Sequence, residues 1–208
     1  MIGPQVTVID YGMGNIWSVL AALRFLNVDA RTSSDPAEIV QSRYLILPGV
    51  GSFRRAMESL RAGGLDRAII DAVRGNRSNI LGICLGMQLL GSWGSEDGET
   101  AGLGLVDCRV DRFTPVDLAG NKSPHIGFNS VKPASGSKIF KGLPEVADFY
   151  FVHSYRMVPE GAPGMVSLCN HGVDFVAAIE VENICGVQFH PEKSQTNGLT
   201  LLRNFLEV

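Results

Sequence analysis

The first half of the chain alternates short apolar runs with segments whose apolar residues recur at intervals of three and four. Val6–Ile9 is a β-branched run and predicts a strand, and the helix expected after it carries an apolar face of Ile16, Val19, Leu20, Leu23 and Leu26. Residues 43–47 predict a second strand with an amphipathic helix at 65–74, and residues 79–83 a third with a helix at 85–90. Such alternation is typical of a parallel sheet with helices on both faces.

The pattern changes in the second half, where strand-like pieces are separated by glycine, proline and asparagine. Residues 149–152, 175–179 and 184–188 predict strands, which we interpret as antiparallel additions and the last strands of the main sheet. The chain closes on a helix with an apolar face of Leu199, Leu202, Phe205 and Leu206. No repeat or linker interrupts this order. The sequence therefore predicts one α/β domain over residues 1–208, with a central, mostly parallel sheet, helices on both faces and antiparallel additions.

Composition agrees with a single core and argues against several kinds of partner. The 208 residues are 45% hydrophobic and 19% charged, which is enough for one substantial core. The formal net charge is −3 and no long basic run occurs, so nucleic acid is not the expected partner. The four cysteines are widely spaced and form no Cys-x-x-Cys pair, which predicts reduced thiols.

Neither a membrane span nor a targeting segment is expected. The uncharged stretch at residues 78–95 is interrupted by Asn79, Gln88 and repeated glycines, so it is too polar to cross a bilayer. Residues 1–5 lack the basic start and apolar run of a signal peptide. We expect a cytoplasmic protein with no membrane contact.

The segment most informative about chemistry is Gly82-x-Cys84-x-Gly86, between a predicted buried strand and a predicted helix. It has the form of a nucleophile elbow with cysteine as the nucleophile, because glycines on either side permit a strained turn where a β-carbon would clash. A thiolate at the start of a helix is stabilised by unpaired amide N–H groups, and the N–H of Leu85 would face a developing oxyanion. The alternative is an inert buried cysteine at an ordinary turn.

A thiolate nucleophile needs a base, and the base needs an orienting partner. His190 follows an apolar strand and would lie at the same sheet edge as Cys84, with the carboxylate of Glu192 two residues later and Pro191 between them. Glu192 would fix the imidazole tautomer and favour its charged form. The alternative is a surface His-Pro turn with a solvated glutamate.

Three further segments contain residues that could bind a ligand. Residues 48–51 follow a strand and could supply a second oxyanion donor, although a simple tight turn explains them equally. Residues 10–17 approach a dinucleotide fingerprint, but Trp17 stands where the third glycine belongs and would obstruct helix–strand packing, so no nucleotide is expected. Cys169 and His171 could begin a zinc site but lack a third and fourth ligand, so no metal is expected.

Taken together, the elbow and the His-Pro-Glu segment resemble the class I (triad) glutamine amidotransferases. Six segments, the last of which contains His190-Pro191-Glu192, resemble in order along the chain the glutaminase subunits of imidazole glycerol phosphate synthases within that family. These are residues 10–15, 47–51, 102–105, 124–129, 149–155 and 188–194. The resemblance implies an α/β fold with a mostly parallel sheet, in agreement with the alternation of elements.

The resemblance also implies roles for individual residues. Cys84 attacks the side-chain amide of glutamine, His190 protonates the departing ammonia and Glu192 orients His190, with an oxyanion hole from the backbone of Val50 and Leu85. The residues expected to bind the glutamine are Gly49, Gly51, Gly86, Gln88, Glu96, His153, Ser154 and Tyr155. No cofactor is implied.

The resemblance further implies a partner, because free ammonia is lost to water unless an acceptor site is coupled. The expected partner is a (β/α)₈-barrel cyclase subunit in a heterodimer with an ammonia tunnel, which makes imidazole glycerol phosphate in histidine biosynthesis. Asn15, Trp17 and Phe128 are the candidate interface residues, although the two aromatics could equally belong to the core. The sequence departs from the family at Phe128, usually Trp, and at Arg156, usually aromatic, and both positions are expected near the partner.

Three alternatives stay open at this point. A paralogous glutaminase could serve an enzyme that modifies a nucleotide sugar for surface polysaccharides. An amidotransferase-like module could lack catalysis and act as a scaffold, although an intact triad argues against this. A cysteine peptidase or γ-glutamyl hydrolase could share the scaffold, and a pocket closed around a free amino acid by Gln88, Glu96 and Tyr155 would argue against it.

Overall fold

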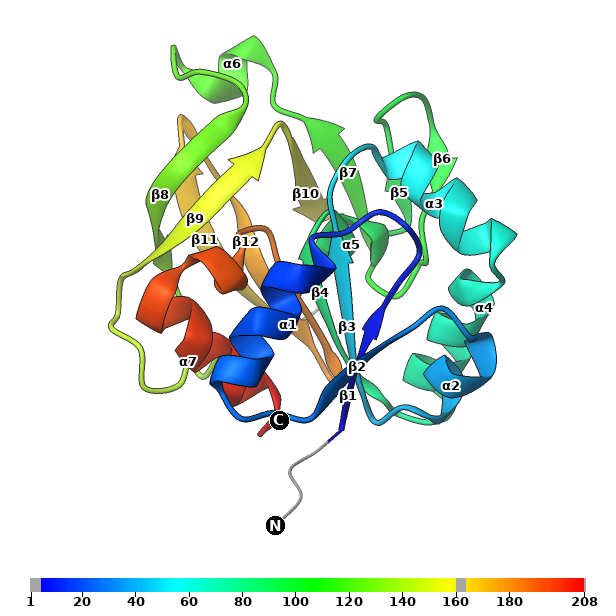
Figure 1. The fold of residues 1–208 in the computed structure, drawn as a ribbon. Coiled ribbons are helices and arrows are strands. Elements are labelled where there is room, and N and C mark those ends of the chain that lie inside the picture. The colour runs from blue at the N-terminus through cyan, green and yellow to red at the C-terminus, as the bar shows by residue number, and fades with distance from the viewer. Residues whose placement is uncertain (1–4, 160–163, 208) are drawn as a thin grey trace.

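The framework of the protein is one nine-stranded sheet with the strand order β2-β1-β3-β4-β13-β12-β11-β8-β9 (Figure 1). The computed structural model describes residues 5–159 and 164–207; residues 1–4, part of the segment expected to hold no signal peptide, lie outside the described residues. The strands that pair in parallel are β1 (Val6–Ile9), β2 (Ala30–Ser33), β3 (Tyr44–Gly49), β4 (Asn79–Cys84) and β13 (Ile184–Val187). Antiparallel strands continue the sheet beyond β13: β12 (Val173–Val181), β11 (Met165–His171), β8 (His125–Lys132) and β9 (Ala147–His153).

A second, four-stranded sheet lies beside the first in the order β10-β7-β5-β6. Its strands are β5 (Trp93–Gly94), β6 (Thr100–Ala101), β7 (Cys108–Arg112) and β10 (Tyr155–Pro159). The helices are α1 (Ile16–Phe25), α2 (Pro36–Gln41), α3 (Phe53–Ala62), α4 (Leu65–Ile70), α5 (Leu85–Leu89), α6 (Pro115–Leu118) and α7 (Gln195–Phe205). A π-helical turn, η1 (Asp71–Gly75), extends α4, and a 3₁₀ turn, η2 (Pro191–Lys193), precedes α7.

Two hydrophobic cores form because successive strand residues point to opposite faces of the sheet. In β3, Leu45 and Leu47 belong to the core shared with α2, α3, α4 and α5, whereas Ile46 belongs to the core shared with α1 and α7. Figure 1 shows α1 and α7 on one side of the parallel strands and α2 to α4 on the other. The predicted α/β architecture is confirmed, with the antiparallel strands joined to the same sheet so that it is mixed.

The apolar pattern did not predict several elements, among them β2, α2 and α3. Helix α3 buries Phe53, Ala56, Met57 and Leu60. Its remaining positions are mostly charged, and the Ser52 side chain caps its start by accepting from the backbone N–H of Arg55. Helix α2 is capped by Asp35 and has proline at its first turn, which is a local signal that an apolar pattern alone does not use.

Of two expectations about helix faces, one was confirmed in part and one was wrong. Helix α7 buries Leu202 and Phe205 as expected, together with Gly198 and Leu201, whereas Leu199 and Leu206 are only partly buried against the same core. Gly198 packs closely against η2, since a β-carbon there would lie 1.8 Å from the carbonyl oxygen of Pro191. Trp17 does not obstruct helix–strand packing, since its side chain is 80% exposed and α1 packs through Val19, Ala22 and Leu23.

No helix among residues 5–159 and 164–207 is long and apolar enough to cross a membrane.

Gly86 makes one of the closest backbone approaches among the described residues and is expected to tolerate no side chain. A β-carbon on Gly86 would lie 1.8 Å from the carbonyl oxygen of Leu47 in β3, so Gly86→Ala must displace α5 from the sheet. We expect a loss of about 3 kcal/mol or more in the free energy of unfolding, measured by urea denaturation. Gly75→Ala is the matched control, since nothing lies within 4 Å of its β-carbon position. Equal stability of the two variants would contradict this packing.

Candidate active site

Cys84 occupies a strained turn between strand β4 and helix α5. Its backbone angles are φ 55° and ψ −111°, a conformation that non-glycine residues rarely adopt and that marks functional positions. The neighbouring glycines make the turn possible, because a β-carbon on Gly82 would lie 2.7 Å from the backbone of Met87 and one on Gly86 would meet β3. The structure thus confirms the predicted elbow and the reason for its glycines.

Strand β3 brings a second glycine-rich turn beside the elbow. Gly49 pairs with Cys84 in the parallel register, and a β-carbon on Gly49 would lie 2.7 Å from the amide nitrogen of Gly86. The Tyr11 hydroxyl donates a 2.9 Å hydrogen bond to the carbonyl of Pro48, which fixes the peptide that leads into Gly49. Burial raises the pKa of Tyr11, so the phenol keeps the proton that this bond requires. The loop at residues 10–15 therefore supports this turn.

His190 and Glu192 form a buried pair. The η2 turn folds Glu192 back so that its Oε1 lies 2.7 Å from His190 Nδ1, and both side chains are almost fully buried. The His190 backbone is fixed as well, since its N–H donates to the carbonyl of Tyr150 and its carbonyl accepts from the Ser194 hydroxyl. The alternative of a solvated glutamate on a surface turn is therefore wrong.

The other nitrogen of the His190 ring is free to act. Within the described residues, Nε2 is buried and has no hydrogen-bond partner. Burial opposes the imidazolium form, but the adjacent Cys84 sulfur and Glu192 carboxylate outweigh it and raise the pKa of His190 to about 9. The histidine is thus held mainly as an acid near neutral pH, next to a cysteine side chain.

Cys84 and His190 line one cavity of about 270 Å³, a size suited to an amino acid. Most residues expected to bind glutamine or its oxyanion line it too: Val50, Gly51, Leu85, Gln88, Glu96, His153, Ser154 and Tyr155. Gly49, Gly86 and Glu192 are not in the lining; the two glycines form the backbone packing behind it and Glu192 lies behind His190. Val152, which the sequence analysis missed, lines it as well, and its carbonyl lies 3.9 Å from Cys84 Sγ.

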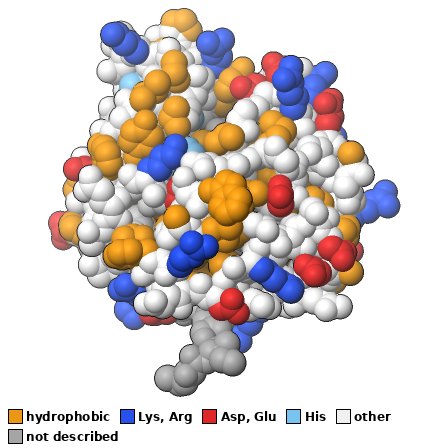
Figure 2. Space-filling view, in the orientation of Figure 1, with side chains coloured by type: hydrophobic (Ala, Val, Ile, Leu, Met, Phe, Trp, Pro, Cys, Tyr) orange, Lys and Arg blue, Asp and Glu red, His pale blue; other side chains and the backbone are white. Residues whose placement is uncertain are grey.

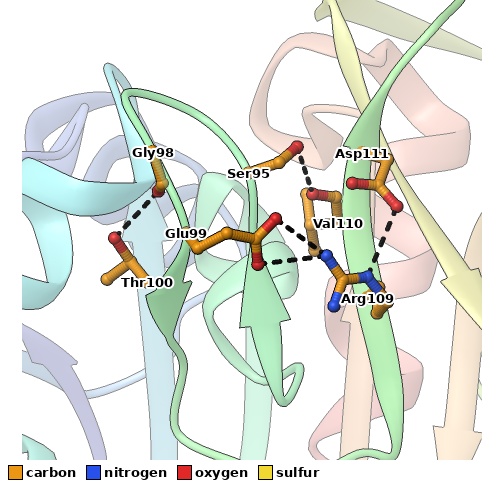
Figure 3. A network of polar contacts seen from close by, with 7 residues as sticks. All are labelled: Ser95, Gly98, Glu99, Thr100, Arg109, Val110 and Asp111. Atoms are coloured by element: carbon orange, nitrogen blue, oxygen red, sulfur yellow. Dashed lines mark hydrogen bonds and ion pairs between the residues drawn. The ribbon is translucent and has the colours of Figure 1, made fainter.

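Glu96 lines the cavity from a short hairpin. Figure 3 shows the polar contacts that join this hairpin to β7. The hairpin joins β5 to β6 and is tied to β7 by the Arg109–Glu99 ion pair at 3.0 Å and by a hydrogen bond from the Ser95 hydroxyl to the carbonyl of Val110. Glu96 Oε2 accepts a 3.0 Å hydrogen bond from the backbone N–H of Phe53. Burial raises the pKa of Glu96, and this hydrogen bond opposes the rise.

His153 lines the cavity, and both nitrogens of its ring have hydrogen-bond partners within the protein. His153 Nδ1 lies 2.8 Å from the carbonyl of Tyr155, so this nitrogen must donate and the other, Nε2, accepts from His125 Nδ1 at 3.0 Å. His125 Nε2 in turn accepts from the Asn129 amide at 3.1 Å. Burial lowers the pKa of His153 to about 3 and that of His125 to about 4, so both rings are neutral.

The third ring of this cluster, His171, stacks on His125 at 4.1 Å and points its Nε2 to the carbonyl of Lys122. Burial raises the pKa of neighbouring Cys169 to about 12, which keeps the thiol protonated. Among the described residues, no group of three or more His, Cys, Asp or Glu side chains could hold a metal ion.

Apolar side chains are exposed on α1 and on the antiparallel strands (Figure 2). Trp17 is 80% exposed and Phe128 is 53% exposed, so neither is the core aromatic that the sequence left possible. Ile126 and Val152, on β8 and β9, are exposed as well. Arg156, the other departure from the family, has a side chain that is 17% exposed, pairs with Asp117 at 3.1 Å and covers the ring of Phe113.

The class-I glutamine amidotransferase family matches residues 7–208. This chain belongs to the class-I glutamine amidotransferases. The amidotransferase is 44% identical to imidazole glycerol phosphate synthase subunit HisH 1 of Parasynechococcus marenigrum, over 97% of each chain. It is 43% identical to subunit HisH 2 of Pseudomonas aeruginosa, and 39% identical to subunit HisH of Escherichia coli, in both cases over 98% of this chain and 100% of the relative.

Solved structures show the same fold as this amidotransferase. A crystal structure of a glutamine amidotransferase superposes with a TM-score of 0.75 at 19% identity, over 97% of each chain. PurLQS from Thermotoga maritima superposes with a TM-score of 0.70 at 17% identity, over 99% of this chain and 98% of the other.

The charge state of His190 in this amidotransferase is directly measurable. We expect its ring to titrate near pH 9 by NMR, and Glu192→Gln to move the midpoint down toward the ordinary value of 6.5, because the neighbouring negative charge is lost. Since the folded-state pKa is raised, the pair stabilises the fold fully below about pH 6.5, and this contribution is lost as the pH rises through 9.

His153 and His125 provide an internal control in the same spectra, since both should stay neutral above pH 5. A His190 midpoint near 6.5 in the unaltered protein would contradict the assigned geometry.

Proposed function

We propose that this amidotransferase is the glutaminase subunit of an imidazole glycerol phosphate synthase and hydrolyses L-glutamine to glutamate and ammonia. The observation that carries the proposal is the buried His190–Glu192 pair, whose free ring nitrogen shares a cavity with a cysteine on a strained elbow. Relatives that are 39–45% identical over nearly the whole chain carry the same subunit name. Residues 1–208 then form one amidotransferase domain that works in the cytoplasm.

The first half of the reaction makes a thioester. The Cys84 thiolate attacks the side-chain amide carbon of glutamine, forming a carbon–sulfur bond as the carbonyl electron pair moves to oxygen. Backbone N–H groups of Val50 and Leu85 stabilise this oxyanion. The carbon–nitrogen bond then breaks, and His190 Nε2 gives its proton to the nitrogen, which leaves as ammonia.

The second half returns the enzyme to its starting state. A water molecule gives a proton to His190 Nε2 and adds to the thioester carbon, and the carbon–sulfur bond breaks to release glutamate and the Cys84 thiolate. Glu192 keeps its hydrogen bond with His190 Nδ1 and stabilises the imidazolium formed at this step. The remaining lining residues, Gly51, Gln88, Glu96, Ser154 and Tyr155, hold the amino acid, with Gly49 and Gly86 supporting the backbone behind it.

Ammonia released here is useful only to an acceptor that docks over the cavity. Trp17 and Phe128 are large, exposed apolar residues, which are typical of a surface that a protein partner covers. We assign this face to a (β/α)₈-barrel cyclase subunit, with Asn15 beside Trp17 on the same loop and helix start. The cyclase receives the ammonia through a tunnel and makes imidazole glycerol phosphate for histidine biosynthesis.

Removal of the nucleophile tests the chemistry. Cys84→Ser should abolish glutamate release, a loss of at least about a thousandfold, because a serine hydroxyl is not ionised by His190, while the cyclase still binds. The assay measures glutamate from glutamine with and without a barrel cyclase and its ligand. Unchanged activity in Cys84→Ser would refute the nucleophile. An active protein on which the cyclase has no effect would favour a nucleotide-sugar enzyme as the acceptor.

The docking face has its own test. Trp17→Ala should weaken cyclase binding by about thirtyfold, because a large exposed aromatic is a typical interface anchor. Phe25→Ala is the matched control: Phe25 is 73% exposed on the same helix but at its other end, away from the carboxyl ends of the parallel strands. Binding measured by calorimetry that falls equally in both variants would contradict the assigned face.

A further inference from the structure

A chain of side-chain amides leads from a backbone carbonyl to the sulfur of Cys84. Gln88 Nε2 donates to the carbonyl of Tyr155 at 3.1 Å and to Gln188 Oε1 at 3.0 Å, and Gln188 Nε2 donates to Cys84 Sγ at 3.7 Å. Gln188 lies directly after β13, two residues before His190, and is completely buried. No sequence pattern indicated a role for Gln188.

The orientation of both amides follows from the end of this chain. A backbone carbonyl can only accept, so the Gln88 atom that faces Tyr155 must be the nitrogen. That nitrogen supplies its second hydrogen to Gln188, so the Gln188 atom facing it must be the oxygen. The remaining end of the Gln188 amide is then its NH₂ group, and it faces the sulfur. The Tyr155 carbonyl is itself fixed by the donated hydrogen bond of His153 Nδ1.

We propose that Gln188 is a further catalytic residue of this site, whose amide N–H hydrogen-bonds to the Cys84 sulfur, stabilises it as the thiolate and holds it toward the cavity. Gln88 is the positioning residue that turns the Gln188 amide. The inference rests on the proposed function of Cys84 as the nucleophile.

Physical chemistry favours this assignment over a purely structural amide. A neutral thiol gains little from an N–H donor, whereas a thiolate is a charged acceptor and gains about twice as much or more. A core position needs no amide, since an apolar side chain of the same length would fill the space without requiring two partners. The amide therefore stabilises the charged sulfur selectively, at a place where His190 stabilises it from another side.

The step that Gln188 assists is the formation of the reactive state. The thiol proton moves from Cys84 Sγ to His190 Nε2, which leaves the negative charge on sulfur and the positive charge on the ring. The Gln188 N–H faces the sulfur when it becomes charged. When the carbon–sulfur bond forms, the charge moves to the amide oxygen of the substrate and this hydrogen bond is no longer needed.

The test compares Gln188→Met with Asn183→Leu in the full chain. Methionine keeps the length of the side chain and removes the donor. Asn183 is the matched control, because its amide is also buried and donates to two backbone carbonyls, those of Val73 and Ser78, at the opposite end of the sheet. The measurement is the rate at which iodoacetamide alkylates Cys84, followed by mass spectrometry of its peptide between pH 5 and 10.

We expect Gln188→Met to move the pH midpoint of alkylation upward by about one unit, equivalent to about tenfold less thiolate below the midpoint. Glutaminase kcat with the cyclase should fall by about the same factor, with the KM for glutamine changed by less than about twofold. Asn183→Leu should lose stability but keep the midpoint of the unaltered protein. A folded Gln188→Met with an unchanged midpoint would overturn the inference.

Two further measurements keep the outcomes distinct. If circular dichroism shows that Gln188→Met does not fold, Gln188→Asn replaces it. Asparagine keeps the amide, but its side chain is shorter by about 1.5 Å and cannot reach the sulfur. The same upward shift in the pH midpoint of alkylation is expected. Alkylation of Cys84 in the unaltered protein that leaves glutaminase activity intact would refute the proposed function itself. If only the Gln188 inference is wrong, alkylation of Cys84 in the unaltered protein still abolishes glutaminase activity.

Discussion

The close approach of helix α5 to strand β3 is the constraint on which the site depends. Gly86 lies against the carbonyl of Leu47 with no room for a single carbon atom, and a β-carbon on Gly82 would lie 2.7 Å from the backbone of Met87. Because α5 cannot move outward, the chain must turn sharply at Cys84, and the residue there takes a backbone conformation that disfavours any side chain. The same packing brings the Gly49 turn to the cysteine. The packing of α5 against β3 therefore sets both the position of the Cys84 sulfur and the position of the proposed oxyanion donors.

The protonation states of the histidines in and around the site are set by burial and by the groups next to each ring. His190 and Glu192 are buried together, so the carboxylate acts on the ring with little screening. The histidines beyond the cavity show the opposite case: without a nearby carboxylate, burial leaves His153 and His125 neutral, and their two protons point along one line toward the carbonyl of Tyr155. Histidine thus serves as an acid at position 190 and as a neutral hydrogen-bonding residue at positions 125 and 153. The presence or absence of a neighbouring carboxylate makes the difference.

The sequence predicts those features of the site that depend on residues close together along the chain. The elbow is visible because two glycines flank Cys84, and the His190–Glu192 pair is visible because a proline turn joins the two side chains. The sequence does not predict Gln188 or Val152, since their roles depend on contacts with residues 104 and 68 positions away. Helix α3 is missed because few of its positions are apolar, and Trp17 is misjudged because one-dimensional spacing does not show to which side of α1 it points. Long-range contacts decide these cases.

Successive side chains of strand β9 point alternately into the core and out to the surface. Phe151 and His153 point inward, so Val152 between them points outward and its side chain is partly exposed, while its carbonyl lies beside the sulfur of Cys84. The wall between the outer surface and the nucleophile is therefore a single residue thick at this point. A molecule that presses on the outside of Val152 pushes on the same peptide unit that borders the reacting atom, with no intervening layer to absorb the displacement.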